Sequence, residues 1–224
     1  MSMTLSLRVL ARLLGYPSVE LRAHLPEMRG ALHAERALTA GRLAELDALM
    51  DTLSSADPLD AEAAYVQLFD RSRATSLHLF EHVHGDSRDR GPAMIDLAQT
   101  YEKAGLYLAP GELPDYLPAV LEFVSTQPPR EARAFLSEMA HIFNALFGAL
   151  QQRQSAYASV IGALLELAGE KARPVKPAPE EPLDESWSEP AVFDGCSSKG
   201  QAAPGQPQPI HIVRKDKPAQ GAPQ

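Results

Sequence analysis

Apolar residues at helical spacing run through most of the chain, and this pattern limits the fold more than any other feature. Near the N-terminus they stand at Leu5, Leu7, Leu10, Leu13 and Leu14, with arginines on the opposite side. Residues three or four apart share one face of an α-helix, whereas a strand needs strict alternation. No alternating stretch interrupts the pattern. The sequence therefore predicts an all-α fold, a single helical bundle domain over residues 1–170.

Capping residues and prolines divide this region into helices. Asp57 precedes Pro58, and a capping carboxylate followed by proline at the first helical position is typical of a helix start. Pro26 should interrupt the second helix of the chain. We expect a third helix over residues 34–53 and, after a Pro-Pro pair, one long helix that carries apolar residues from Phe135 to Leu150.

The composition changes near residue 171. Ten of the 19 prolines lie between Pro174 and Pro223, and such a segment buries too little apolar surface to offset the entropy of ordering it. We therefore expect residues 171–224 to form a flexible tail rich in Pro and Gly. An apolar island near residues 187–196 is a candidate element for docking back onto the helical domain.

Composition also excludes several classes of protein. The 224 residues carry a formal net charge of −8, whereas a general nucleic-acid-binding protein needs clustered Lys and Arg to neutralise phosphates. The single cysteine, Cys196, permits no intramolecular disulfide, which fits a reducing compartment. Arginines interrupt the apolar N-terminus, and no window is long and apolar enough to span a membrane. We expect a cytoplasmic protein.

The densest mixture of histidines, aromatic residues and charge lies between Tyr65 and Gly91. It holds three of the seven histidines, His78, His82 and His84. On a helix the first two would share a face, and three nitrogens with a water are typical ligands of a catalytic zinc. The H-E-x-x-H pattern is missing, however, and nearby arginines oppose a cation. A metal-dependent hydrolase built on these histidines is therefore the alternative to a binding function.

Charged residues of both signs alternate in the same stretch. Interleaved carboxylates and arginines more often pair with one another than act as an acid–base dyad, so we expect an ion-pair network that holds a turn, at residues 82–86, between two helices. Its members are Asp70, Glu81, Asp86, Arg88, Asp89 and Arg90. No nucleophile elbow or Gly-rich nucleotide loop is present, so no catalytic residue is assigned.

Aromatic residues on both sides of this turn could line a groove between helices. An amphipathic helical peptide would lay its apolar face in such a groove. The other interpretation is that these aromatic residues belong to the core. The candidate peptide-binding residues are Tyr65, Leu68, Phe69, Phe80, His82, His84, Asp115 and Tyr116.

Three segments of the chain resemble a known family. They are Tyr65–Asp70 (YVQLFD), Leu79–Gly91 (LFEHVHGDSRDRG) and Glu112–Pro118 (ELPDYLP). The second is long and specific, and the similarity extends over about residues 5–167. On these residues the chain resembles the molybdenum cofactor assembly chaperones of respiratory nitrate reductase, the NarJ-type or delta-subunit family, within the wider group of redox-enzyme maturation chaperones.

The resemblance implies a fold, a function and partners. The protein would be an all-helical chaperone, not an enzyme, and would bind no metal or cofactor stably. It would bind the N-terminal segment of the catalytic alpha subunit and hold the immature alpha–beta complex in the cytoplasm. It would assist insertion of molybdenum–bis(guanine dinucleotide) into that client, with cofactor-insertion proteins as further partners, before the complex attaches to its membrane subunit.

One position departs from the family pattern. Many relatives carry a histidine directly after the Pro-Asp pair of the third segment, where this chain has Tyr116. A tyrosine keeps a hydrogen-bonding tip but does not titrate near neutral pH as an imidazole does. Any contact that the histidine makes with a client must therefore be made differently here.

Overall fold

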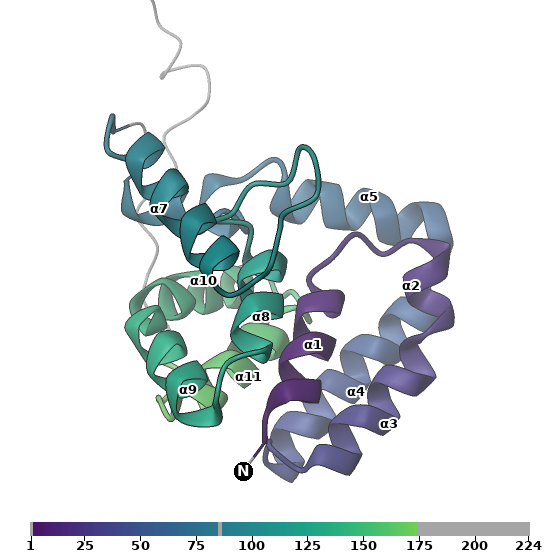
Figure 1. The fold of residues 1–224 in the computed structure, drawn as a ribbon. Helices are drawn as coiled ribbons and strands as arrows, with labels where there is room; N and C mark the ends of the chain where they lie inside the picture. The colour runs from purple at the N-terminus through teal and green to yellow at the C-terminus, as the bar shows by residue number, and fades with distance from the viewer. Residues whose placement is uncertain (1, 85–86, 174–224) are drawn as a thin grey trace, which may run out of the picture. The chain divides into compact units, whose positions relative to one another are not determined.

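The computed structural model describes residues 2–84 and 87–173. Within these ranges the chain forms eleven α-helices, one turn of 3₁₀ helix and no β-strand (Figure 1). They are α1 (Thr4–Leu13), α2 (Val19–Ala23), α3 (Leu25–Glu35), α4 (Ala40–Ser55), α5 (Pro58–Phe69), η1 (Arg73–Thr75), α6 (Leu79–Val83), α7 (Arg90–Lys103), α8 (Leu117–Ser125), α9 (Pro129–Glu138), α10 (Ala140–Gln152) and α11 (Ala158–Ala168). The predicted all-α fold is confirmed.

The predicted tail lies almost wholly outside the described residues, and so does its candidate docking element at residues 187–196. In the part of the chain that is described, no helix has the length and apolar character needed to cross a membrane.

Helices α1 and α11 each pack against several other helices in the core. Helix α1 lies between α8 and α3 (Figure 1) and also contacts α11. Leu7, Leu10 and Leu14 are fully buried, as their spacing predicts. Helix α11 contacts α4, α9 and α10, and residues on different sides of it, such as Val160, Ile161 and Ala163, have no exposed surface. A helix that is apolar all round belongs in the interior.

The helix that we expect over residues 34–53 corresponds to α4, and it begins later than the sequence indicates. Helix α3 continues to Glu35 and ends where Arg36 takes a left-handed conformation with φ of 57°. Helix α4 then starts at Ala40, because the hydroxyl of Thr39 accepts a hydrogen bond from the backbone N–H of Arg42. The expected helix over residues 34–53 is therefore wrong at its start, and the local cap explains the true boundary.

Two further boundaries also differ from the prediction. The expected long helix after Pro129 is divided at Met139, where φ is −86° and ψ is 0°, into α9 and α10. The expected turn at residues 82–86 starts too early, because His82 and Val83 form the end of α6. No proline or glycine marks the break at Met139. The break coincides instead with the separate packing of α9 and α10 against α11.

The N-terminus of α1 is capped by a carboxylate from the end of α3. Glu35 accepts hydrogen bonds from the backbone N–H groups of Leu5 (3.1 Å) and Ser6 (2.7 Å) and from the hydroxyl of Ser2 (2.9 Å). The first N–H groups of a helix have no partner within the helix, and a negative charge there also meets the positive end of the helix dipole. Glu35 therefore ties the start of α1 to α3.

Two other helices are capped in the same way. Glu166 on α11 accepts a bond of 2.6 Å from the N–H of Thr39, which precedes α4. Asp115 accepts a bond of 3.2 Å from the N–H of Phe80 in the first turn of α6. Each of these bonds joins segments that are far apart in the sequence.

We expect Glu35→Gln to lower the free energy of unfolding by about 1 kcal/mol at pH 7. Burial alone would raise the pKa of Glu35, but the hydrogen bonds from Ser6, Ser2 and Leu5 outweigh it and hold the pKa below its ordinary value. A carboxyl whose pKa is lower in the folded state stabilises the fold above its unfolded-state pKa, and this contribution is lost as the pH falls through the folded-state pKa.

Urea denaturation of both proteins at several pH values tests this. The difference should be largest at neutral pH and should shrink toward zero in acid. Glu102→Gln, at an exposed site on α7, is the matched control and should change nothing. A difference between Glu35→Gln and the parent that stays constant at every pH would contradict the capping role.

Candidate functional site: a groove over α1 and α8

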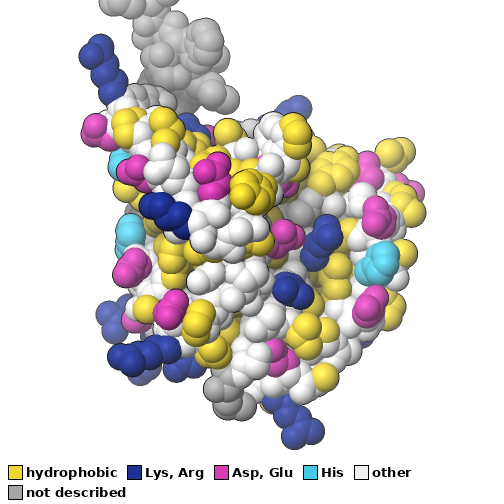
Figure 2. Space-filling model, viewed as in Figure 1, with side chains coloured by type: hydrophobic (Ala, Val, Ile, Leu, Met, Phe, Trp, Pro, Cys, Tyr) yellow, Lys and Arg dark blue, Asp and Glu magenta, His cyan; other side chains and the backbone are white. Residues whose placement is uncertain are grey.

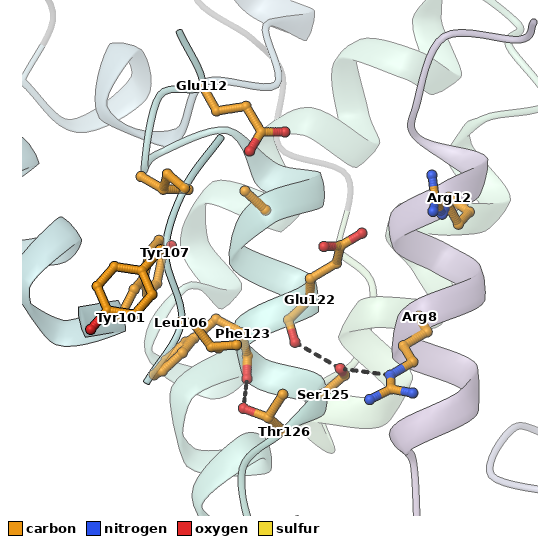
Figure 3. A pocket seen from close by; sticks show the side chains of 12 residues that line it. Arg8, Arg12, Tyr101, Leu106, Tyr107, Glu112, Glu122, Phe123, Ser125 and Thr126 are labelled. Carbon is orange, nitrogen blue, oxygen red and sulfur yellow. Dashed lines mark hydrogen bonds between the residues drawn. The ribbon is translucent and has the colours of Figure 1, made fainter. Parts of the chain in front are cut away.

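Two adjoining pockets form one groove over α1 and α8. The first has a volume of about 380 Å³ and is lined by α1, the α7–α8 loop and α8 (Figure 3). The second has a volume of about 550 Å³ and is lined mainly by α1, α2, α3 and the start of α8. Both are lined by Arg12, Glu112, Ala119 and Glu122, so they are continuous. The groove runs from the α7–α8 loop to α3.

Apolar side chains line both halves of the groove. Tyr107 and Phe123 contribute to the first pocket, and Leu21 and Met28 contribute to the second. Tyr107, at one end of the groove, is 81% exposed, and Tyr16, in the lining of the second pocket, is 47% exposed. Exposed aromatic side chains beside a concave apolar surface are typical of a binding site.

Charged side chains lie on both walls of the groove. Arg8 and Arg12 come from α1, and Glu122 comes from α8 (Figure 3). The Nε of Arg8 donates to the hydroxyl of Ser125 at 3.3 Å. No ion pair within 4.0 Å joins either arginine to another of the described residues. Both guanidinium groups are exposed and can therefore meet a bound partner.

Tyr65 and Phe69 lie in an aromatic cluster of the core. They are 4% and 5% exposed, and their ring centroids are 4.8 Å apart. The ring of Tyr157 lies 5.1 Å from that of Phe69. The Tyr65 hydroxyl donates to the carbonyl of Leu14 at 2.8 Å and lies 3.3 Å from the Tyr116 hydroxyl. In this conformation Tyr65 and Phe69 therefore present no surface to a partner, whereas Tyr116 lines the groove.

Burial and the neighbouring Tyr116 hydroxyl raise the pKa of Tyr65 above its ordinary value. Its hydroxyl therefore remains a neutral hydrogen-bond donor at physiological pH. The bond to Leu14 satisfies a carbonyl at the end of α1, and so Tyr65 links that helix end to the side chain that borders the groove.

Asp115 lies in the loop before α8, is fully buried, and links this loop to the starts of α6 and α7. Its carboxylate accepts hydrogen bonds from Nδ1 of His78 (3.2 Å) and from the N–H of Phe80 (3.2 Å), and the Arg90 guanidinium lies 3.8 Å away. The backbone of His78 pairs with that of Tyr116 in an isolated antiparallel bridge. The hydrogen bond to Asp115 raises the pKa of His78. Asp115 therefore holds these segments together from the interior and does not border the groove.

The residues expected to form an ion-pair network are only partly in contact. Arg90 lies 3.5 Å from Glu81 and 3.8 Å from Asp115, while Asp89 accepts a bond of 3.1 Å from the Ser87 hydroxyl. Two more, Arg88 and Asp70, have exposed side chains. Asp86 lies outside the described residues.

Arg90→Ala should lower the free energy of unfolding by about 1 kcal/mol, a modest figure because Arg90 and Glu81 are both partly exposed to solvent. Arg88→Ala is the matched control, with an expected effect within about 0.5 kcal/mol because its side chain is exposed. Thermal unfolding of the two variants side by side would distinguish them, and equal losses would show that the contacts of Arg90 do not stabilise the fold.

The three histidines of this region have separate partners. His78 bonds Asp115, the Nε2 of His82 lies 2.8 Å from the carbonyl oxygen of Ser76, and the ring of His84 packs against Phe80 with centroids 5.4 Å apart. Among the described residues, no three His, Cys, Asp or Glu side chains gather closely enough to hold a metal ion. The arrangement gives no support to a metal-dependent hydrolase.

Seven of the eight candidate peptide-binding residues, all except Tyr116, lie outside the groove lining. Leu68 and Phe80 are partly buried against the core, and His82 and His84 are half-buried. The charged residues that line the groove, such as Arg12 and Glu122, appear in the sequence only as the polar sides of helices. The one sequence signal for this charged lining is the spacing of Arg8 and Arg12, because residues four apart share a helix face.

Residues 35–161, more than half of the chain, match the family model described as the nitrate reductase delta subunit. The chain belongs to this family. The resemblance noted from the sequence is confirmed, and the groove is therefore a feature of a delta-subunit-type protein.

Two relatives and one solved structure extend this comparison. The Escherichia coli (strain K12) nitrate reductase molybdenum cofactor assembly chaperone NarJ is 48% identical over 164 residues, which cover 73% of this chain and 70% of the relative. A Bacillus subtilis (strain 168) protein that carries the NarJ chaperone name is 30% identical over 158 residues, covering 70% and 84%. A crystal structure described as a redox enzyme maturation protein from Archaeoglobus fulgidus shares the fold, with a TM-score of 0.55 at 20% identity over 76% of this chain and 96% of that chain.

Proposed function

We propose that this protein is a chaperone for the assembly of nitrate reductase with its molybdenum cofactor, and that it binds the N-terminal segment of the catalytic alpha subunit in the groove over α1 and α8. Membership of the delta subunit family and the names of its relatives support the assembly role, which is non-catalytic. In the cytoplasm it holds the immature alpha–beta complex while molybdenum–bis(guanine dinucleotide) is inserted, with cofactor-insertion proteins as further partners. Membrane attachment follows.

The observation that carries the peptide-binding part is the continuity of the two pockets across α1 and α8. An amphipathic helix binds in a groove through apolar anchors on one face, with charged residues along the rim. Here apolar side chains line both halves, and exposed charges of both signs stand on the walls. A segment of a partly folded client can bind in this way without any chemical step.

Among the residues predicted from the sequence, Tyr116 is the one that we place in contact with the client. Tyr65 and Asp115 position it, since the Tyr65 hydroxyl lies 3.3 Å from that of Tyr116 and the backbone beside Asp115 pairs with His78. Tyr116 occupies the position where many relatives have histidine, so its hydroxyl would supply the polar contact at this point of the groove.

Isothermal titration with a synthetic peptide of the cognate alpha-subunit N-terminus tests the function. We expect saturable binding of one peptide per chaperone. Ala119→Trp would fill the groove where the two pockets meet and should weaken binding by roughly tenfold or more, a loss of about 1.4 kcal/mol.

The matched control is Ala44→Trp, an equal change at an exposed position of α4 outside the groove. It should bind as the parent does. Absence of binding by a folded parent protein would overturn the proposed function. Unchanged binding by a folded Ala119→Trp protein would move the peptide site away from this groove.

A further inference from the structure

The two ends of the groove differ in charge. At the α2–α3 end the lining includes Glu20 and Glu27, both exposed, together with His24. Figure 2 shows acidic side chains on either side of a histidine over these helices. Within the described part of the chain, neither glutamate forms an ion pair. The negative charge at this end is therefore available to a bound partner.

The opposite end carries a cation. Arg8 lines only the first pocket, where its Nε donates to the hydroxyl of Ser125 (Figure 3). The charges where the pockets meet are Arg12 on α1, Glu112 in the α7–α8 loop and Glu122 on α8; all three line both pockets, so they do not distinguish the two ends. The difference between the two ends thus rests on Arg8 at one end and the two glutamates at the other.

A bound helix also has charged ends. Its N-terminus carries a partial positive charge of about half an elementary charge, and its C-terminus carries the matching negative charge. In a segment that begins a protein chain, a free α-amino group adds to the positive end near neutral pH. The acidic end of the groove complements the first of these ends, and Arg8 complements the second.

From this complementarity we propose that the groove fixes the direction of the client helix. The N-terminus of the alpha-subunit segment lies at the α2–α3 end, beside Glu20 and Glu27, and its C-terminal end lies beside Arg8. This orientation rests on the proposed function, and it makes the two glutamates and Arg8 specificity-determining residues. The reversed helix would place its amino group beside a guanidinium and its negative end beside two carboxylates.

Paramagnetic broadening in NMR spectra of the ¹⁵N-labelled full chain tests the direction. The client peptide is prepared in two forms, with a nitroxide on a cysteine near its N-terminus or near its C-terminus, and each is purified before mixing. We expect the first form to broaden amide signals of Glu20 to Met28, and the second to broaden those of Phe123 to Thr126.

The opposite pattern, or equal broadening at both ends by both forms, would overturn the orientation. In either case the peptide has bound, so the proposed function survives. If an unlabelled peptide does not bind in the titration described above, the function itself fails, and the two results are therefore distinguishable.

A charge-removal series gives an independent measure. The double variant Glu20→Gln/Glu27→Gln should bind the peptide roughly threefold more weakly at low salt and show a smaller salt dependence, as expected for exposed charge pairs. Acetylation of the peptide's amino terminus, which removes its positive charge, should reduce the difference in peptide affinity between the parent and the double variant. Glu131→Gln, on α9 and outside the groove, is the control. Unchanged affinity of the double variant at low salt would overturn the electrostatic basis of the proposal.

Discussion

Asp115→Asn should lower the free energy of unfolding by about 2–3 kcal/mol, because it removes the charge from a buried carboxylate that several groups share. Asp115 has no exposed surface, and it accepts bonds from His78 and from the backbone of Phe80, with Arg90 at 3.8 Å. The asparagine keeps the shape but places a neutral amide beside these donors. Urea denaturation at constant pH and salt gives the change directly.

Asp89→Asn is the matched control, an identical change at an exposed position just before α7, with an expected effect within about 0.5 kcal/mol. The loss at Asp115 should also depend on pH. Its hydrogen bond raises the pKa of His78, so the stabilisation is complete below the unfolded-state pKa of about 6.5 and is lost as the pH rises through the higher folded-state pKa. The variant should therefore differ more from the parent at pH 6 than at pH 8.

These measurements separate an interior role for Asp115 from a role in client contact. A residue that contacts only the client would leave the stability of the free chaperone unchanged and reduce peptide affinity. A stability of Asp115→Asn equal to that of the parent, together with lost peptide binding, would contradict the interior role.

Features fixed by neighbouring residues could be predicted from the sequence. Asp57 caps α5 as expected, since its carboxylate accepts bonds from the N–H groups of Leu59 and Asp60. The apolar spacing of α1 identified its buried face correctly except at Leu5, which is 45% exposed. Both signals operate within one or two helical turns, where the chain geometry determines which groups can meet.

Features that depend on distant partners could not be predicted in this way. Glu35 and Glu166 cap helices that begin 29 or more residues away, and nothing near either glutamate in the sequence indicates the helix that it meets. The break at Met139 has no local signal. Such features follow from the packing of helices against one another. Periodicity in the sequence describes each helix separately and does not show which helices meet.

The candidate site shows the same limit. Periodicity places Arg12 and Glu122 on polar helix faces, but only the packing of α1 beside α8 brings those faces to one groove. Tyr65 and Phe69 were compatible with groove or core, and the ring of Tyr157, far along the chain, completes the cluster that buries them. Tyr116 could be identified as a candidate because it lies in the segment Glu112–Pro118 (ELPDYLP), one of the three that resemble the family.

Tyr65→Ala should lower the free energy of unfolding by about 3–5 kcal/mol, the usual range for removing a large buried aromatic side chain. The ring packs against Phe69 and Tyr157, and its hydroxyl bonds the carbonyl of Leu14. Tyr65→Phe keeps the ring and loses that bond and the contact with the Tyr116 hydroxyl, so it should cost about 1 kcal/mol. Chemical denaturation of both variants measures the ring and the hydroxyl separately.

Tyr107→Ala provides the contrast, because this ring is 81% exposed at the end of the groove. It should leave stability within about 0.5 kcal/mol of the parent and should weaken peptide binding instead. Tyr65→Ala and Tyr107→Ala thus divide the aromatic residues between those that build the fold and those that meet the client. A stable Tyr65→Ala protein that no longer binds the peptide would place Tyr65 in the binding surface, and the core assignment would then be wrong.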